Sequence, residues 1–130
     1  MATMKVRFYA AEPETGAPAT ATIAAGGVAT RVDYVPSFVD GSGSRELIPR
    51  VWEQASALID GAFALPLDEV ADAVRVVAER TRVIAEGAGA LSVATALSSR
   101  LAGARRVVCI VSGGNIDPAV LSRILVGEKP

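Results

Sequence analysis

Four adjacent residues of this 130-residue sequence, Ser112, Gly113, Gly114 and Asn115, are the best suited to contact a ligand. A serine hydroxyl can donate a hydrogen bond to an unprotonated nitrogen or accept a proton, and paired glycines let a bound group approach the backbone closely. Glycine turns that follow strands are also common structural features of α/β folds. Spacing alone therefore favours a structural turn and leaves ligand contact as the alternative.

The stretch Glu86-Gly87-Ala88-Gly89-Ala90 is the second candidate. Glu86 could present a carboxylate at the N-terminal end of a helix, where the helix dipole favours negative charge. The small residues could instead let that helix pack closely on a sheet. From the residues alone, packing is the favoured interpretation.

Two acidic stretches complete the set of candidates. Glu12-Pro13-Glu14 follows an apolar run, and a carboxylate there could hold a hard cation, although such a cation needs several oxygens gathered in space. Solvated loop charges are therefore the favoured interpretation. Asp40-Gly41 is typical of a turn.

The elements around the serine-glycine turn indicate where it lies. Val107 to Val111 are five apolar residues in a row, which predicts a strand covered on both faces, as in parallel sheets. Asp117 and Pro118 predict the N-cap and first residue of a helix. In open α/β sheets, ligands bind at the carboxyl ends of such strands.

Apolar periodicity along the rest of the chain predicts one α/β domain spanning residues 1–130. We expect three layers, with a mostly parallel sheet flanked by helices. The further predicted elements are strands over 5–11 and 62–65, helices over 15–25, 46–58, 68–80, 91–101 and 118–126, and a long loop over 28–44.

The composition excludes several kinds of chemistry. With no histidine in the sequence, Ser-His-Asp and Cys-His catalysis and histidine-containing zinc sites are excluded. The two lysines, Lys5 and Lys129, lie near the ends of the chain, where neither is expected to be a positioned, desolvated amine. Cys109 falls within the predicted strand and is expected to be a small buried hydrophobe.

Charge and hydrophobicity indicate which partners and which cellular location to expect for the chain. The 13 basic and 14 acidic residues are scattered, so we expect no binding to nucleic acid or to an anionic membrane. No apolar run approaches the ~20 residues of a membrane span, and the start does not resemble a signal peptide, so we expect a cytoplasmic location. A hydrophobic content of 51% is high for a short chain and indicates that some apolar surface meets a partner.

Together, four strings resemble the carboxyl-terminal portion of threonine and serine dehydratases. They are EPET at 12–15, SFVDG at 37–41, the segment 67–97 with AEGAGA near its end, and VVCIVSGGNID at 107–117. These dehydratases are fold-type II pyridoxal-phosphate enzymes, with serine racemase as a close relative. The resemblance spans about residues 5–125 and implies that the chain is part of the large domain of such an enzyme.

The resemblance also implies roles for the candidate residues. The Ser112 hydroxyl would face the pyridine nitrogen of pyridoxal 5'-phosphate, and a neutral donor there favours β-elimination over transamination. The rest of the cofactor site would comprise Gly113, Gly114, Asn115, Glu86 and Gly87, while Asp40 and Gly41 match a loop near the domain interface. Glu12 matches a carboxylate that binds a divalent cation in serine racemase-like members, but the further acidic ligand falls near Pro18, which speaks against a metal.

Two segments of the family are absent from these 130 residues. They are the Ser-x-Lys-x-Arg-Gly-type segment with the Schiff-base lysine and the glycine-rich phosphate-binding loop, both on the amino-terminal side of the matched region. We therefore expect no catalytic residue in this chain, no activity of the chain alone, and no regulatory ACT domain. The expected partner is the amino-terminal part of the same enzyme or a complementary subunit, in a homo- or hetero-oligomer.

Two other functions stay open on the sequence. The apolar composition also suits a non-catalytic interaction module or partner subunit derived from such an enzyme. A binder of a small phosphorylated ligand at the Gly87 or Gly113 turn is disfavoured, because neither turn contains a basic residue.

Overall fold

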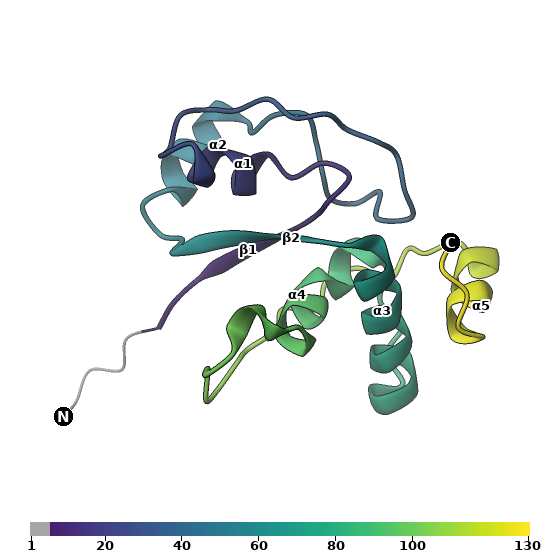
Figure 1. Ribbon diagram of the computed structural model, residues 1–130. Coiled ribbons are helices and arrows are strands. Elements are labelled where there is room, and N and C mark those ends of the chain that lie inside the picture. Colours follow the sequence, from purple (N-terminus) through teal and green to yellow (C-terminus); the bar gives the residue numbers. More distant parts are fainter. Residues whose placement is uncertain (1–5) are drawn as a thin grey trace.

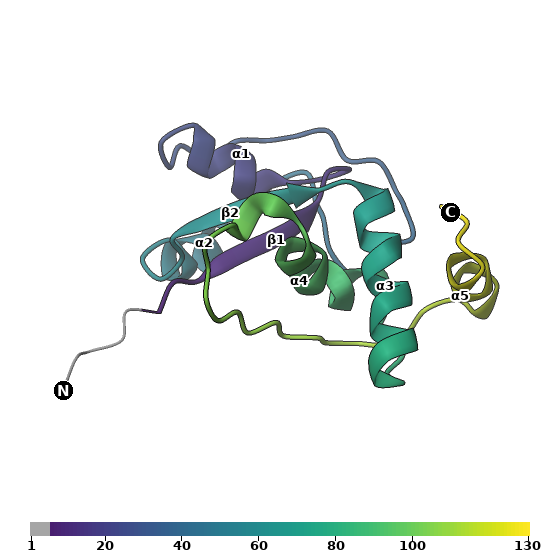
Figure 2. The ribbon, with the colours of Figure 1, turned by 60° about the horizontal axis from the view of Figure 1, so that its bottom comes forward.

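Two parallel strands lie at the centre of the computed structural model, which describes residues 6–130 (Figure 1). Strand β1 (Tyr9–Pro13) pairs with β2 (Gly61–Leu65) in a register that places Tyr9 opposite Gly61. The other elements are α1 (Pro18–Ala24), α2 (Pro49–Ala55), α3 (Leu67–Thr81), α4 (Gly87–Leu97), the 3-10 helix η1 (Ser99–Leu101) and α5 (Pro118–Leu125). Figures 1 and 2 show α1 on one face of the strands and α4 on the other. The predicted α/β class, a parallel sheet flanked by helices, is confirmed.

The core forms where α3 and α4 pack beneath the strands. The predicted helix over 68–80 is confirmed as α3, and its apolar residues at helical spacing, Val70, Ala73, Val74 and Val77, are all buried. Small residues of α4 allow the two helices to approach closely. The remaining core residues are Val39, Leu65, Ala71, Ala85, Ala90, Leu91, Ala94 and Ile124.

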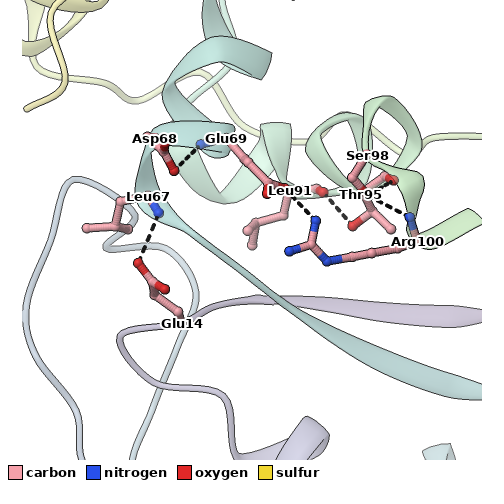
Figure 3. A network of polar contacts seen from close by, with 8 residues as sticks. All are labelled: Glu14, Leu67, Asp68, Glu69, Leu91, Thr95, Ser98 and Arg100. Carbon is pink, nitrogen blue, oxygen red and sulfur yellow. Dashed lines mark hydrogen bonds and ion pairs between the residues drawn. The ribbon is translucent and has the colours of Figure 1, made fainter.

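A chain of polar contacts connects the end of α4 to the start of α3 (Figure 3). The Ser98 hydroxyl donates to the Thr95 carbonyl at 2.7 Å and accepts from the Arg100 N–H at 3.2 Å, as the chain leaves α4 for η1. The Arg100 guanidinium then reaches Glu69 Oε2 at 2.5 Å. This half-buried ion pair joins η1 to α3, and the extended backbone of Ser98 divides the predicted helix over 91–101 into α4 and η1.

Helix starts follow the local sequence. Asp117 Oδ1 accepts from the N–H groups of Ala119 and Val120, at 2.7 and 3.4 Å, and Pro118 is the first residue of α5, as predicted. Helix α1 also begins with a proline, but its N-cap residue, Ala17, has no side chain that can accept a hydrogen bond.

Glu12 caps α1 in place of Ala17. Its Oε1 accepts from the Ala19 N–H at 3.0 Å, and its Oε2 accepts from the N–H and the hydroxyl of Thr20, at 2.9 and 3.0 Å. The Glu12 side chain is buried, so the interpretation of this carboxylate as a solvated loop charge is wrong. It ties the end of β1 to the start of α1.

The predicted strand over 107–111 is not part of the sheet. In the described part of the chain these residues run extended beside α4 without pairing to another strand (Figure 2), and Val108 and Ile110 are 91% and 78% exposed. A strand forms only beside another backbone, and residues 6–130 place none there. The Ser92 hydroxyl donates to the Ile110 carbonyl at 2.8 Å, and the Cys109 thiol donates to the Ser92 carbonyl at 3.4 Å. Cys109 is consequently half-buried rather than enclosed.

Other boundaries also differ from the predictions. The helix predicted over 46–58 contracts to α2, which has no buried residue, and Leu58 is 70% exposed. The strand predicted over 5–11 begins at Tyr9; Lys5 lies outside the described residues. Within residues 6–130, no helix has the length and apolar character needed to cross a membrane.

We expect Glu12→Ala to lower the free energy of unfolding by about 2–3 kcal/mol, because it leaves two backbone N–H groups and a hydroxyl without their acceptor. Chemical denaturation of the chain measures the change. Glu53→Ala on α2 is the control, because its exposed side chain can be lost with an effect of about 0.5 kcal/mol or less. Equal losses for the two variants would contradict the capping role.

Candidate functional site

The turn at residues 112–115 lies directly against the start of α4. Glu86, the N-cap residue of α4, donates its backbone N–H to the Gly113 carbonyl at 3.2 Å. Its side chain accepts the Asn115 N–H at Oε2, at 3.1 Å. The two motifs that the sequence offered as separate candidates therefore form one cluster.

Glycines make this close approach possible. A Cβ at Gly89 would overlap the Ser112 carbonyl oxygen, and a Cβ at Gly114 would lie 2.8 Å from the Ile84 carbonyl oxygen. Gly113 has a φ of 73°, and a Cβ there would overlap the Glu86 carboxylate. These glycines thus allow close packing, as predicted, but between α4 and the turn rather than between α4 and the sheet, and the surface that they pack is the candidate site itself.

The loop that contains Asp40 and Gly41 forms a third side of the cluster. Its neighbour Val39 is buried in the core, and a Cβ at Gly87 would come within 3.0 Å of the Phe38 carbonyl oxygen. A Cβ at Gly41 would lie 3.3 Å from Glu86 Oε1. Local spacing predicted only a turn at Asp40-Gly41 and missed this proximity; the one signal in the sequence was the resemblance of SFVDG to a family segment.

Ser112, Gly113, Gly114 and Asn115 are all exposed. The Ser112 hydroxyl has no hydrogen-bond partner within residues 6–130, so it can donate to an acceptor on a ligand. A neutral hydroxyl beside two glycines fits an aromatic ring nitrogen that approaches the turn. In contrast, Gly87 is buried against the 37–41 loop.

Glu12 does not join this cluster. Both of its carboxylate oxygens are bound to α1, and the described residues contain no group of three histidine, cysteine or acidic side chains that could hold a metal ion. The structure gives the Glu12 carboxylate a capping role. A cation role for Glu12 stays a prediction from the resemblance.

The fold and the site define an α/β protein with a serine-glycine turn docked on the start of a helix. The sequence profile of the family described as "Pyridoxal-phosphate dependent enzyme" matches residues 2–113. The chain therefore belongs to the family of pyridoxal-phosphate-dependent enzymes, whose complete members use pyridoxal phosphate as cofactor.

The relatives support the narrower resemblance. The chain is 34% identical over 99 residues to an L-threonine ammonia-lyase of Thermotoga maritima, covering 76% of this chain and 25% of the relative. It is 36% identical over 121 residues to a biosynthetic L-threonine dehydratase of Mycobacterium tuberculosis, covering 88% and 28%. The processed threonine deaminase isoform 2 of Solanum lycopersicum superposes with a TM-score of 0.80 at 25% identity, covering 94% and 37%. The chain thus spans about a quarter of the length of these two curated relatives.

Gly113→Ala and Gly26→Ala form a matched pair that tests the docked turn. Both glycines have a positive φ, 73° and 70°, but a Cβ at Gly26 meets no atom within 4 Å. We expect Gly26→Ala to cost about 1 kcal/mol of unfolding free energy for the left-handed backbone, and Gly113→Ala to cost about 1 kcal/mol more because it displaces Glu86. Chemical denaturation of both variants measures this difference. Equal losses of unfolding free energy would show that the turn is not packed against Glu86.

Proposed function

We propose that this chain, as a single domain, supplies the pyridine side of the cofactor site in a cytoplasmic L-threonine/L-serine dehydratase. Such an ammonia-lyase converts a hydroxyamino acid to a 2-oxo acid and ammonia. The observation that carries the proposal is the exposed Ser112 hydroxyl at a glycine turn docked on the start of α4.

Pyridoxal phosphate, when bound, acts as the electron sink for loss of the β-hydroxyl group. The Ser112 hydroxyl would donate a hydrogen bond to the pyridine nitrogen. Being neutral, it does not stabilise a protonated ring nitrogen as a carboxylate would, which favours β-elimination over transamination. Gly113 and Gly114 would let the ring approach, with Asn115, Glu86 and Gly87 around the same turn.

The amine that binds the cofactor is proposed to come from outside these 130 residues. The Nζ of Lys129 bonds to the Asp68 carbonyl at 3.2 Å and to Asp72 Oδ2 at 2.9 Å, so it is engaged at α3. Lys5 lies outside the described residues. We therefore assign the lysine and the phosphate-binding loop to the amino-terminal part of the enzyme or to a complementary subunit.

The extended segment 107–111 is the proposed docking surface for that partner. Val108 and Ile110 are exposed, and the backbone of the segment pairs with no strand among residues 6–130. Both features suit a neighbouring β-strand, which would complete the sheet. An open apolar cleft of about 370 Å³ lies beside it, lined by Val76, Val77, Arg80, Thr81, Val83, Val93 and Val111. An interaction module without catalysis would use the same surface, so cofactor binding distinguishes the two functions.

The activity is tested with the purified chain, pyridoxal phosphate and L-threonine or L-serine, with 2-oxo acid formation as the measurement. We expect no turnover by the chain alone. We expect turnover when it is mixed with the product of an upstream reading frame that carries the lysine and the glycine-rich loop, and a loss of about tenfold or more in the Ser112→Ala mixture.

Ser56→Ala is the matched serine control for Ser112→Ala, because Ser56 is an exposed residue at the end of α2 and its hydroxyl donates to the Glu53 carbonyl at 3.3 Å. Turnover by the chain alone would refute the assignment of the lysine to another segment. A complex that forms but binds no cofactor would favour the interaction module.

The docking surface is tested with Val108→Asp and Ile110→Asp. We expect each to weaken copurification with the lysine-bearing part by about tenfold or more, because a buried charge without a partner is costly. Val28→Asp, at a residue that is 69% exposed, is the control and should have no effect. If Val28→Asp weakened copurification as much as Val108→Asp or Ile110→Asp, the proposed docking surface would be contradicted.

Alkylation of Cys109 gives a second measurement of docking. Burial raises the pKa of the Cys109 thiol, and a hydrogen bond with Ser92 partly offsets this. At a given pH the reactive thiolate is therefore less populated than in an ordinary thiol, and the alkylation rate should rise as the pH is raised. Docking of the partner strand should slow this reaction further.

A further inference from the structure

We propose that Glu86 is a positioning residue, which acts on the reaction by holding the turn that carries Ser112. This inference rests on the proposed function, because it assigns Glu86 a role within the same cofactor site. The resemblance alone placed Glu86 near the cofactor ring without saying what its carboxylate does.

Glu86 holds the turn at two points. Its backbone N–H binds the Gly113 carbonyl at 3.2 Å, and its Oε2 accepts the Asn115 N–H at 3.1 Å. These bonds lie on either side of Gly114. The turn therefore cannot slide along α4 without breaking one of them.

The second carboxylate oxygen is confined by two glycines. A Cβ at Gly113 would overlap Oε1, and a Cβ at Gly41 would lie 3.3 Å from it. The Glu86 carboxylate thus fills the space between the turn and the 37–41 loop. With one oxygen bonded to the backbone and the other between two glycines, it is placed to hold structure rather than to transfer a proton.

Besides the Glu86 bonds, this turn is held from outside by backbone packing, of Gly89 on the Ser112 carbonyl and of Gly114 on the Ile84 carbonyl. Apart from the Glu86 bonds, its hydrogen bonds in the described structure are local, such as that from the Ile116 N–H to the Gly114 carbonyl at 3.0 Å. Ser112 to Asn115 are exposed, so burial does not fix them either. The hydrogen bonds that hold the turn carrying Ser112 against α4 are therefore those of Glu86.

The first test uses the chain without cofactor and follows the Asn115 amide by NMR. Glu86→Ala should speed Asn115 amide exchange by about tenfold, the change expected for one lost hydrogen bond. Glu86→Gln should preserve slow exchange, because its side-chain amide oxygen can still accept the Asn115 N–H.

Glu79→Ala, at an exposed residue of α3, is the control and should leave Asn115 amide exchange unchanged. Unchanged Asn115 exchange in Glu86→Ala would overturn the proposal.

The second test measures pyridoxal phosphate affinity by fluorescence in the complex with the lysine-bearing part. Glu86→Ala should raise the Kd by about tenfold, and Glu86→Gln by less than about threefold. In the Ser112→Ala background, Glu86→Ala should add nothing, because the two residues act in series. Additive effects would show that Glu86 binds the cofactor directly and would overturn the positioning role.

The two tests separate this inference from the proposed function. A complex that binds no cofactor would refute the proposed function, while the Asn115 amide would still decide whether Glu86 holds the turn.

Discussion

The close approach of two backbone segments, the start of α4 and the turn at residues 112–115, is the constraint on which the rest of the site depends. Gly89 lies so near the Ser112 carbonyl that no side chain fits between them. This contact brings the end of the 107–111 segment onto the helix, and it also places Glu86 where its backbone and carboxylate both reach the turn. The small residues of α4 are therefore part of the site as well as of the core.

The sequence predicted the elements whose pattern is local. The apolar spacing of α3, the Asp117-Pro118 start of α5 and the short strand β2 all follow from nearby residues. The strand over 107–111 could not be predicted in the same way, because its existence depends on a neighbouring backbone that residues 6–130 do not provide.

The sequence predicted the individual residues of the candidate site, but not how these residues come together in space. No local sequence pattern indicates that the Glu86 carboxylate contacts the Asn115 backbone or that Gly41 lies beside this carboxylate, since these contacts join segments far apart in the chain. Glu12 is a similar case. Helix α1 starts at a proline, and the preceding Ala17 cannot cap it. This sequence indicates that the first N–H groups of the helix need an acceptor from elsewhere in the chain, which is Glu12.

The unpaired 107–111 segment has a consequence for how the chain can be produced. An extended, β-branched stretch with exposed backbone is a template for any other strand, including the same segment of a second copy. Chains that accumulate with this edge uncovered would therefore aggregate through it at high concentration. A strand from the proposed partner would cover the edge, so co-expression with that partner would limit the aggregation.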